Sequence, residues 1–339
     1  MHPILFCLLG LVRGDVPGYV ELSSAGGNSF KLPAIFESGP FRAVISHVLP
    51  ASARDLYKIL FVEPPKRLEV PKNVKHGTIK EVQENFINAV LASCEEHNFI
   101  SHTCACPETY ADLQALDDTS VYALAAIAVN KKQKRIVVSY RGTVTFQNLL
   151  DDFDFQMTSI PGLAEEVQVH RGFYLHYLSL YYPVRAAMTR YIESPAYANY
   201  TLQITGFSLG GAIGTIALPG WISFLEEKKD KRNVELFTYS SPRAGNAHFA
   251  DYINGLNVPV TRYTFQNDLV PHTPPRSANY VHVGVEIHQE ITLDGSKNFT
   301  ICSQEYDEDP NCAWKNKDHL DLNQHIRAFN RTFPAPMLC

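Results

Sequence analysis

Ser208 has the sequence surroundings of a catalytic nucleophile. It lies in a G-x-S-x-G motif, Gly206-Phe207-Ser208-Leu209-Gly210. A strand-like run at 202–205 precedes the motif and a helical run to residue 224 follows it, which is the strand–turn–helix context that such a serine requires. The glycines allow neighbouring backbone to come close. The turn would project the hydroxyl from a sheet edge, beside the amide that follows it; the alternative is a glycine-rich helix cap.

A serine hydroxyl becomes a good nucleophile only when a base accepts its proton and an acid orients that base. In strand–turn–helix folds the expected chain order is serine, carboxylate, histidine. Asp268 follows a strand-like run at 260–265, so it would reach the same sheet edge as Ser208. An aspartate that caps a turn after a strand is the alternative.

The base must come from the histidines after Asp268, which are His272, His282, His288, His319 and His325. The first is too close in sequence to fold back onto Asp268. The next two lie on the non-valine face of an alternating run, which favours structural roles. The last two lie beyond the last expected strand, and spacing alone does not separate them.

Strand-like and helical runs alternate along the chain. We expect strands at 121–129, 135–140, 202–205, 234–239, 260–265 and 280–288, and helices at 79–94, 172–192, 209–224 and 249–256. Pro183 would kink or break the second helix. In the last strand, the side chains of Val281, Val283, Val285 and Ile287 would share one face. Such alternation predicts an α/β fold whose mostly parallel or mixed sheet is covered on both faces.

The composition excludes two classes of protein. Among 339 residues, 45% are hydrophobic and 19% charged, which rules out intrinsic disorder. The net charge of −5 provides no field that would attract nucleic acid. We find no Cys/His spacing typical of zinc, so we expect no metal and no cofactor.

The two ends and the cysteines indicate secretion. Residues 1–14 resemble a signal peptide whose apolar run at 4–12 is too short to span a membrane; a buried strand is the alternative. Residues 15–77 would be a propeptide with a dibasic site at Lys66-Arg67, or an N-terminal extension that forms an extra lobe. Residues 78–339 would form the catalytic domain, with no transmembrane anchor. Three sequons, at Asn199, Asn298 and Asn330, are compatible with glycosylation of a secreted surface.

If Cys7 leaves with the signal peptide, an even number of cysteines remains, at Cys94, Cys104, Cys106, Cys302, Cys312 and Cys339. An even number suits three disulfides, although the pairing cannot be deduced from spacing.

From residue 79 onward the chain resembles the fungal class 3 lipases, secreted triacylglycerol lipases whose family also holds feruloyl esterases and mono/diacylglycerol lipases. The resemblance rests on six motifs in order: Tyr140-Arg141-Gly142-Thr143, His170-Arg171-Gly172-Phe173, Gly206 to Ala212, Ser241-Pro242-Arg243-Ala244-Gly245-Asn246, Asn267-Asp268-Leu269-Val270-Pro271 with Pro274-Pro275, and Asp318-His319-Leu320. It implies an α/β-hydrolase with a helical lid.

The resemblance also implies site residues. The nucleophile would be Ser208, the acid Asp268 and the base His319, because the Asp-His-Leu motif favours it over His325. The oxyanion hole would be formed by Thr143 and the Leu209 amide.

The resemblance implies a lid at about 144–154, with Phe146, Leu149, Leu150 and Phe153 on one helical face; a core helix is the alternative. The implied disulfides are Cys94–Cys339, Cys104–Cys106 and Cys302–Cys312. Phe207 departs from the family, which usually has histidine before the serine.

These features predict a secreted, monomeric serine lipase that hydrolyses carboxylic esters of acylglycerols at a lipid interface through an acyl-enzyme. The alternatives are a feruloyl-esterase-like enzyme acting on non-lipid esters, a phospholipase A1, or a catalytically silent lipid-binding protein of the same fold.

Overall fold

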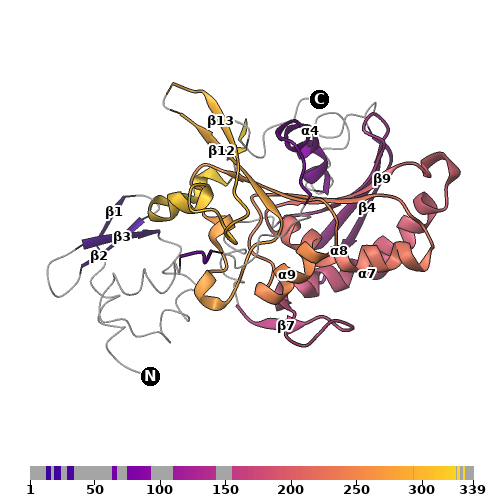
Figure 1. The fold of residues 1–339 in the computed structure, drawn as a ribbon, viewed down its shortest axis with the longest axis horizontal. Coiled ribbons are helices and arrows are strands. Elements are labelled where there is room, and N and C mark those ends of the chain that lie inside the picture. Colours follow the sequence, from indigo (N-terminus) through magenta and orange to yellow (C-terminus); the bar gives the residue numbers. More distant parts are fainter. Residues whose placement is uncertain are drawn as a thin grey trace.

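The computed structural model describes residues 13–16, 19–23, 29–33, 63–66, 75–92, 110–142, 155–292, 294–325, 327–328 and 331–332. Among them, an eight-stranded sheet forms the centre, with helices on both faces (Figure 1). The predicted α/β class with a mostly parallel mixed sheet is confirmed. The proposed helical lid lies outside the described residues.

The strands follow each other across the sheet in the order β13 (Lys297–Ile301), β12 (Val285–Ile291), β11 (Val260–Phe265), β10 (Val234–Tyr239), β9 (Thr201–Phe207), β6 (Arg135–Tyr140), β5 (Ala123–Asn130) and β4 (Tyr110–Asp118). Neighbours from β6 to β12 are parallel, and the flanking pairs are antiparallel. The central strands are rich in β-branched and aromatic residues because both of their faces are buried. Their carboxyl ends therefore meet at one edge.

Three helices lie below the sheet in Figure 1: α7 (Arg171–Ile192), α8 (Leu209–Glu227) and α9 (Ala247–Gly255). The helix α4 (Ile79–Ala89) covers the opposite face, and it begins at a capping box between Thr78 and Glu81. Of the described helices, α8 is long and apolar enough to span a membrane, and most of it is buried in the core. The helix α7 continues through Pro183, so of the two expected effects, a kink or a break, the break does not occur.

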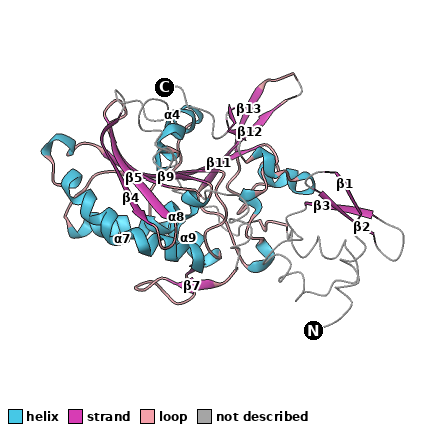
Figure 2. Cartoon of the chain, turned by 180° about the vertical axis from the view of Figure 1, so that it is seen from behind, coloured by secondary structure: helices cyan, strands magenta, loops and turns pink. Residues whose placement is uncertain are grey.

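The remaining described elements are short. Three antiparallel strands, β1 (Arg13–Val16), β2 (Tyr19–Ser23) and β3 (Ser29–Pro33), form a separate sheet, visible at one end of the molecule in Figure 2. Two antiparallel pairs are formed by β7 (Met157–Ser159) with β8 (Gln168–His170), and by β14 (Arg327–Ala328) with β15 (Arg331–Thr332). The 3₁₀ turns are η3 (Pro195–Tyr197), η4 (Val270–His272), η5 (Arg276–Ala278), η6 (Ala313–His319) and η7 (Leu322–Gln324).

The expected strand at 280–288 is wrong in its first half. Gly284 has a φ of +65°, which turns the chain, and β12 begins only at Val285. Val281 and Val283 consequently join the core cluster on the α8 side, whereas Ile287 joins the cluster beneath α4. The alternation of apolar residues in the sequence continues across this turn, whose positive φ glycine adopts without strain.

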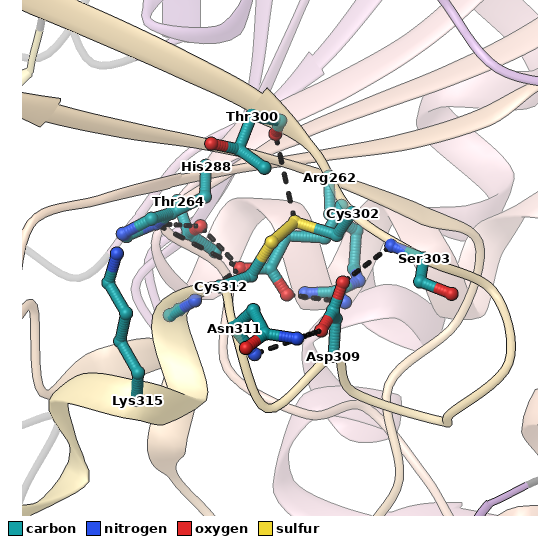
Figure 3. The surroundings of a disulfide bond; sticks show 12 residues. Arg262, Thr264, His288, Thr300, Cys302, Ser303, Asp309, Asn311, Cys312 and Lys315 are labelled. Carbon is teal, nitrogen blue, oxygen red and sulfur yellow. Dashed lines mark hydrogen bonds and ion pairs between the residues drawn. A yellow bond between two sulfur atoms is a disulfide. The ribbon is translucent and has the colours of Figure 1, made fainter.

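The predicted Cys302–Cys312 disulfide is present and closes a loop after β13. Figure 3 shows the bond between the strand residues Thr264 and His288 and the loop residues Asp309 and Asn311. The Asp309 carboxylate accepts hydrogen bonds from the backbone amides of Ser303 at 2.6 Å and Asn311 at 2.9 Å. The other expected pairs, Cys94–Cys339 and Cys104–Cys106, lie outside the described residues, as does Asn330.

Candidate active site

Ser208 occupies a strained turn between β9 and α8. Its φ of 57° and ψ of −131° lie outside the regions that non-glycine residues favour. Its amide nevertheless donates to the Tyr239 carbonyl at 2.9 Å, which extends the pairing of β9 with β10 by one residue. The residue lies at the start of α8, so its side chain is near the helix N-terminus. This is the geometry that a nucleophile elbow requires.

Glycines make this turn possible because the backbone is packed without room for side chains. A Cβ on Gly206 would lie 2.2 Å from the carbonyl carbon of Gly210, and one on Gly210 would lie 1.9 Å from the Tyr140 oxygen. A Cβ on Gly142 would lie 3.2 Å from that of Ser208. The chain leaving β6 therefore passes directly beside the serine.

Asp268 lies in the turn after β11 and is 1% exposed. Its carboxylate faces His325, whose Nδ1 is 2.8 Å from one oxygen and 3.1 Å from the other. The same carboxylate accepts a hydrogen bond from the Val270 amide at 2.9 Å. His325 itself is fully buried. A buried imidazole held through Nδ1 by a carboxylate is the orienting half of a serine–histidine–acid triad.

The structure does not bring His319, the base implied by the resemblance, to Asp268. His319 ends the turn η6 and is exposed, and its carbonyl accepts from the Asn267 side chain. The chain then pairs Asp321 beside Asp268, with the Asp321 amide donating to the Asn267 carbonyl at 2.8 Å. Only after that pairing does η7 bring His325 to the carboxylate. Spacing had left both histidines open, and the one that the structure places against Asp268 is not the one in the Asp-His-Leu motif.

Phe207, which departs from the family pattern, packs on the imidazole. Its ring centroid is 4.8 Å from that of His325. The ring of Phe86, on α4, packs edge-on against Phe207 with the two centroids 6.4 Å apart. The residue before the serine thus covers the histidine with an apolar ring.

Three other histidines near this edge are buried. Burial lowers the pKa of His170 to about 3 and that of His272 to about 4, and it holds the pKa of His282 well below its ordinary value. His272 Nδ1 lies 3.1 Å from the backbone carbonyl of Asp268, and His282 Nε2 lies 2.7 Å from that of Pro271. Both side chains therefore support the turn that carries Asp268, and neither reaches its carboxylate.

The remaining predicted site residues divide into two groups. Leu209 begins α8, as the proposed oxyanion hole requires, and is buried. Thr143 and the lid residues Phe146, Leu149, Leu150 and Phe153 lie outside the described part of the chain.

Among the described residues, one group has ligand atoms close enough to hold a metal, and it consists of Glu286, Cys302 and Cys312. Its two sulfurs are joined in the disulfide, so they do not offer thiolates.

A mostly parallel mixed sheet with an elbow serine at its carboxyl edge defines an α/β-hydrolase. Residues 137–278 match the family described as Lipase (class 3). This match and the relatives below support the resemblance of the chain to the class 3 lipase family.

The relatives are fungal. The chain is 31% identical over 219 residues to a lipase of Rhizopus oryzae, covering 63% of this chain and 52% of that protein. It is 33% identical over 182 residues to secreted mono- and diacylglycerol lipase 1 of Fusarium solani, covering 52% and 50% of the two chains. The aligned part of the chain spans about half the length of these relatives.

Solved structures share the fold. The propeptide complex of Rhizomucor miehei lipase superposes with a TM-score of 0.66 at 20% identity, covering 86% of this chain and 92% of that one. The lipase of Rhizopus microsporus var. chinensis superposes with a TM-score of 0.61 at 26% identity, covering 80% and 95%.

Proposed function

We propose that this protein hydrolyses carboxylic esters of acylglycerols with Ser208 as nucleophile, His325 as base and Asp268 as the orienting acid. The pairing of His325 with Asp268 at the edge that carries the elbow serine is the observation on which the proposal rests. The revised base replaces His319 and leaves the other two members of the triad as the sequence suggested.

The proposed role of each ring nitrogen of His325 follows from the partner of its Nδ1. Asp268 accepts from Nδ1 of His325, so Nε2 is the nitrogen that takes the proton of Ser208 as its oxygen attacks the ester carbonyl. The Leu209 amide at the start of α8, with Thr143, stabilises the oxyanion. His325 then returns the proton to the departing alcohol, and water hydrolyses the acyl-enzyme.

A lipid is the proposed substrate because two features agree. The Fusarium solani relative is named a mono- and diacylglycerol lipase, and a matched structure is described as a triacylglycerol lipase. The expected lid at 144–154 carries four large apolar side chains at helical spacing, which suits contact with a lipid surface. We propose that this contact occurs outside the cell.

Secretion is supported by the buried disulfide and by two exposed sequon asparagines, Asn199 and Asn298. The N-terminal region is proposed to be a propeptide that docks on the loop after β13. Trp314 Nε1 donates to Glu63 at 2.8 Å, and Lys317 lies 3.3 Å from the same carboxylate. Lys66 lies 3.3 Å from Glu305.

The test combines covalent labelling with a substrate panel. A phosphonate ester should label the wild-type protein at Ser208 alone, and Ser208→Ala should abolish both labelling and hydrolysis of p-nitrophenyl esters. Ser241→Ala is the matched control because Ser241 is also buried at this sheet edge, after β10. Unchanged activity in Ser208→Ala would refute the proposal.

The panel compares tri-, di- and monoacylglycerols with a phospholipid and a feruloyl ester. We expect the acylglycerols to be the best substrates and the rate to rise once the substrate forms an interface. A preference for the phospholipid or for the soluble aromatic ester would assign the site to one of the alternative activities. Lipid binding without turnover would indicate a silent hydrolase fold.

A further inference from the structure

We infer that Arg243 is a positioning residue, which holds the turn carrying Asp268 in the place where its carboxylate meets His325. This inference rests on the proposed function. Arg243 lies in the loop after β10, is fully buried, and touches neither the serine nor the histidine in any contact described above. Its side chain instead forms hydrogen bonds with the far end of the turn that carries Asp268.

Three consecutive carbonyls of that turn accept hydrogen bonds from this one residue. Nη1 of Arg243 donates to the His272 oxygen at 2.5 Å and to the Pro274 oxygen at 2.7 Å. The backbone amide of Arg243 donates to the Thr273 oxygen at 2.7 Å. The end of the turn is thereby fixed to the loop after β10.

Hydrogen bonds within this short turn connect its end to its beginning. A fixed end therefore also holds the beginning, where Asp268 lies, in place. The His272 amide donates to the Leu269 carbonyl at 2.9 Å, and the His272 ring lies 3.1 Å from the Asp268 carbonyl. The Val270 amide in turn donates to the Asp268 carboxylate at 2.9 Å. Movement at His272 would therefore shift the carboxylate that orients His325.

Glu308 holds the guanidinium from the other side. Its two carboxylate oxygens accept from Nε and Nη2 of Arg243, each at 2.7 Å. Burial alone would raise the pKa of Glu308, but Arg243 holds that pKa well below the ordinary range, so the pair is ionised. Glu308 lies between Cys302 and Cys312, so the disulfide closes the loop that carries it; Figure 3 shows the next residue, Asp309, on the loop side of the bond.

The loop that carries Arg243 also contacts the nucleophile's helix. A Cβ on Gly211 would lie 2.7 Å from that of Ser241, and the Gly211 amide donates to the Ser208 carbonyl at 2.9 Å. The loop after β10 thus packs against the start of α8 through Ser241, and it holds the turn that carries Asp268 through Arg243. This arrangement sets the position of the acid relative to the nucleophile.

The competing explanation is that Arg243 only stabilises the fold, and the chain offers a matched control. The Arg232 side chain is 1% exposed, pairs with Asp230 at 2.7 Å, and donates to the carbonyls of Ile192 and Tyr197 at 3.2 and 3.3 Å. Like Arg243, Arg232 donates hydrogen bonds to backbone carbonyls. It lies just before β10, at the opposite edge of the sheet from Ser208.

The experiment is a double-mutant cycle between Arg243 and Asp268, measured as kcat and KM on a p-nitrophenyl ester. Arg243→Lys keeps the charge but loses the fork geometry. We expect it to lower kcat about tenfold to a hundredfold with KM within about twofold, because it acts on orientation of the base. In an Asp268→Asn background the same substitution should change kcat by less than about twofold, because the group it positions is gone.

Arg232→Lys should leave kcat within about twofold in both backgrounds while lowering the melting temperature. If Arg243→Lys does not fold, Glu308→Gln tests the same contact and should give the same dependence on Asp268. Equal losses with and without Asp268, or a loss confined to the melting temperature, would overturn the inference. An inactive, unlabelled wild type would instead overturn the proposed function, and this inference with it.

Discussion

Both edges of the central sheet contain non-glycine residues with positive φ, but in different surroundings. At the carboxyl edge, the strands β9, β10 and β11 are each followed by a non-glycine residue with positive φ, which are Ser208, Ser240 and Gln266 at 57°, 47° and 48°. The amide of each donates to a carbonyl of the next strand at 2.8–2.9 Å. At the opposite edge, positive φ values of 53–54° occur at Lys134, Lys229 and Asn257, and all three residues are exposed.

The comparison separates strain from function. A non-glycine residue in a sparsely populated φ/ψ region costs on the order of 1–3 kcal/mol at either edge, so strain by itself marks no site. Both edges also hold a buried arginine that binds backbone carbonyls, Arg243 at one and Arg232 at the other. What distinguishes the carboxyl edge is that the edge with the strained serine also holds a fully buried imidazole paired with a carboxylate.

The largest expected difference between the edges concerns their aspartates. Asp268→Asn should lower kcat by about 10⁴-fold, because the amide holds the imidazole in the wrong tautomer. Asp230→Asn, which weakens the Arg232 pair at the other edge, should lower the melting temperature and leave kcat within about twofold. Steady-state kinetics with thermal unfolding checks both variants, and similar kcat values in the two would remove the distinction.

A smaller effect is expected in the pH dependence of stability. Burial lowers the pKa of His272 to about 4 from 6.5, so between these pH values the unfolded chain binds a proton that the folded protein does not. The free energy of unfolding should therefore fall as pH falls through this window, by up to about 1.4 kcal/mol per pH unit, and level off below it.

His272→Gln should flatten this dependence between pH 6.5 and about 4, as measured by urea unfolding at several pH values. His248→Gln is the control because His248 is exposed on α9. An unchanged slope in His272→Gln would show that His272 is not held neutral in the folded protein.

The smallest effect is expected at the exposed turns. Lys134→Gly should raise the free energy of unfolding by about 0.5–1 kcal/mol, because glycine adopts a φ of 53° without strain. Lys132→Gly in the same turn is the control and should lower it, since glycine there only adds freedom to the unfolded chain. Chemical denaturation of both variants measures this, and a loss of stability in Lys134→Gly would contradict the strain argument.

Local chemistry made much of the site predictable. The elbow requires glycines at fixed positions around Ser208, and strands such as 234–239 and 260–265 carry buried β-branched and aromatic residues, so both were evident in the sequence. The Cys302–Cys312 pair followed from the family resemblance and is present. These features depend on contacts close in sequence or on a motif tied directly to backbone geometry.

The histidine that pairs with Asp268 was not predictable in this way because its place depends on tertiary pairing. Which histidine reaches Asp268 is decided by Asp321 pairing beside that residue and by the turn η7, and neither leaves a signal in spacing. The hydrogen bonds of Arg243 to the carbonyls of His272 and Pro274 left no signal in the sequence for the same reason. A buried arginine in a proline-flanked motif becomes informative only when its acceptors are known.

The central claim is that His325, and not His319, is the base that acts with Ser208 and Asp268. The most direct measurement compares kcat/KM of His325→Ala and His319→Ala on the same p-nitrophenyl ester, with folding verified by thermal unfolding. We predict that His325→Ala loses activity by at least about 10³-fold and that His319→Ala stays within about threefold of wild type. Full activity in His325→Ala together with loss in His319→Ala would contradict the account.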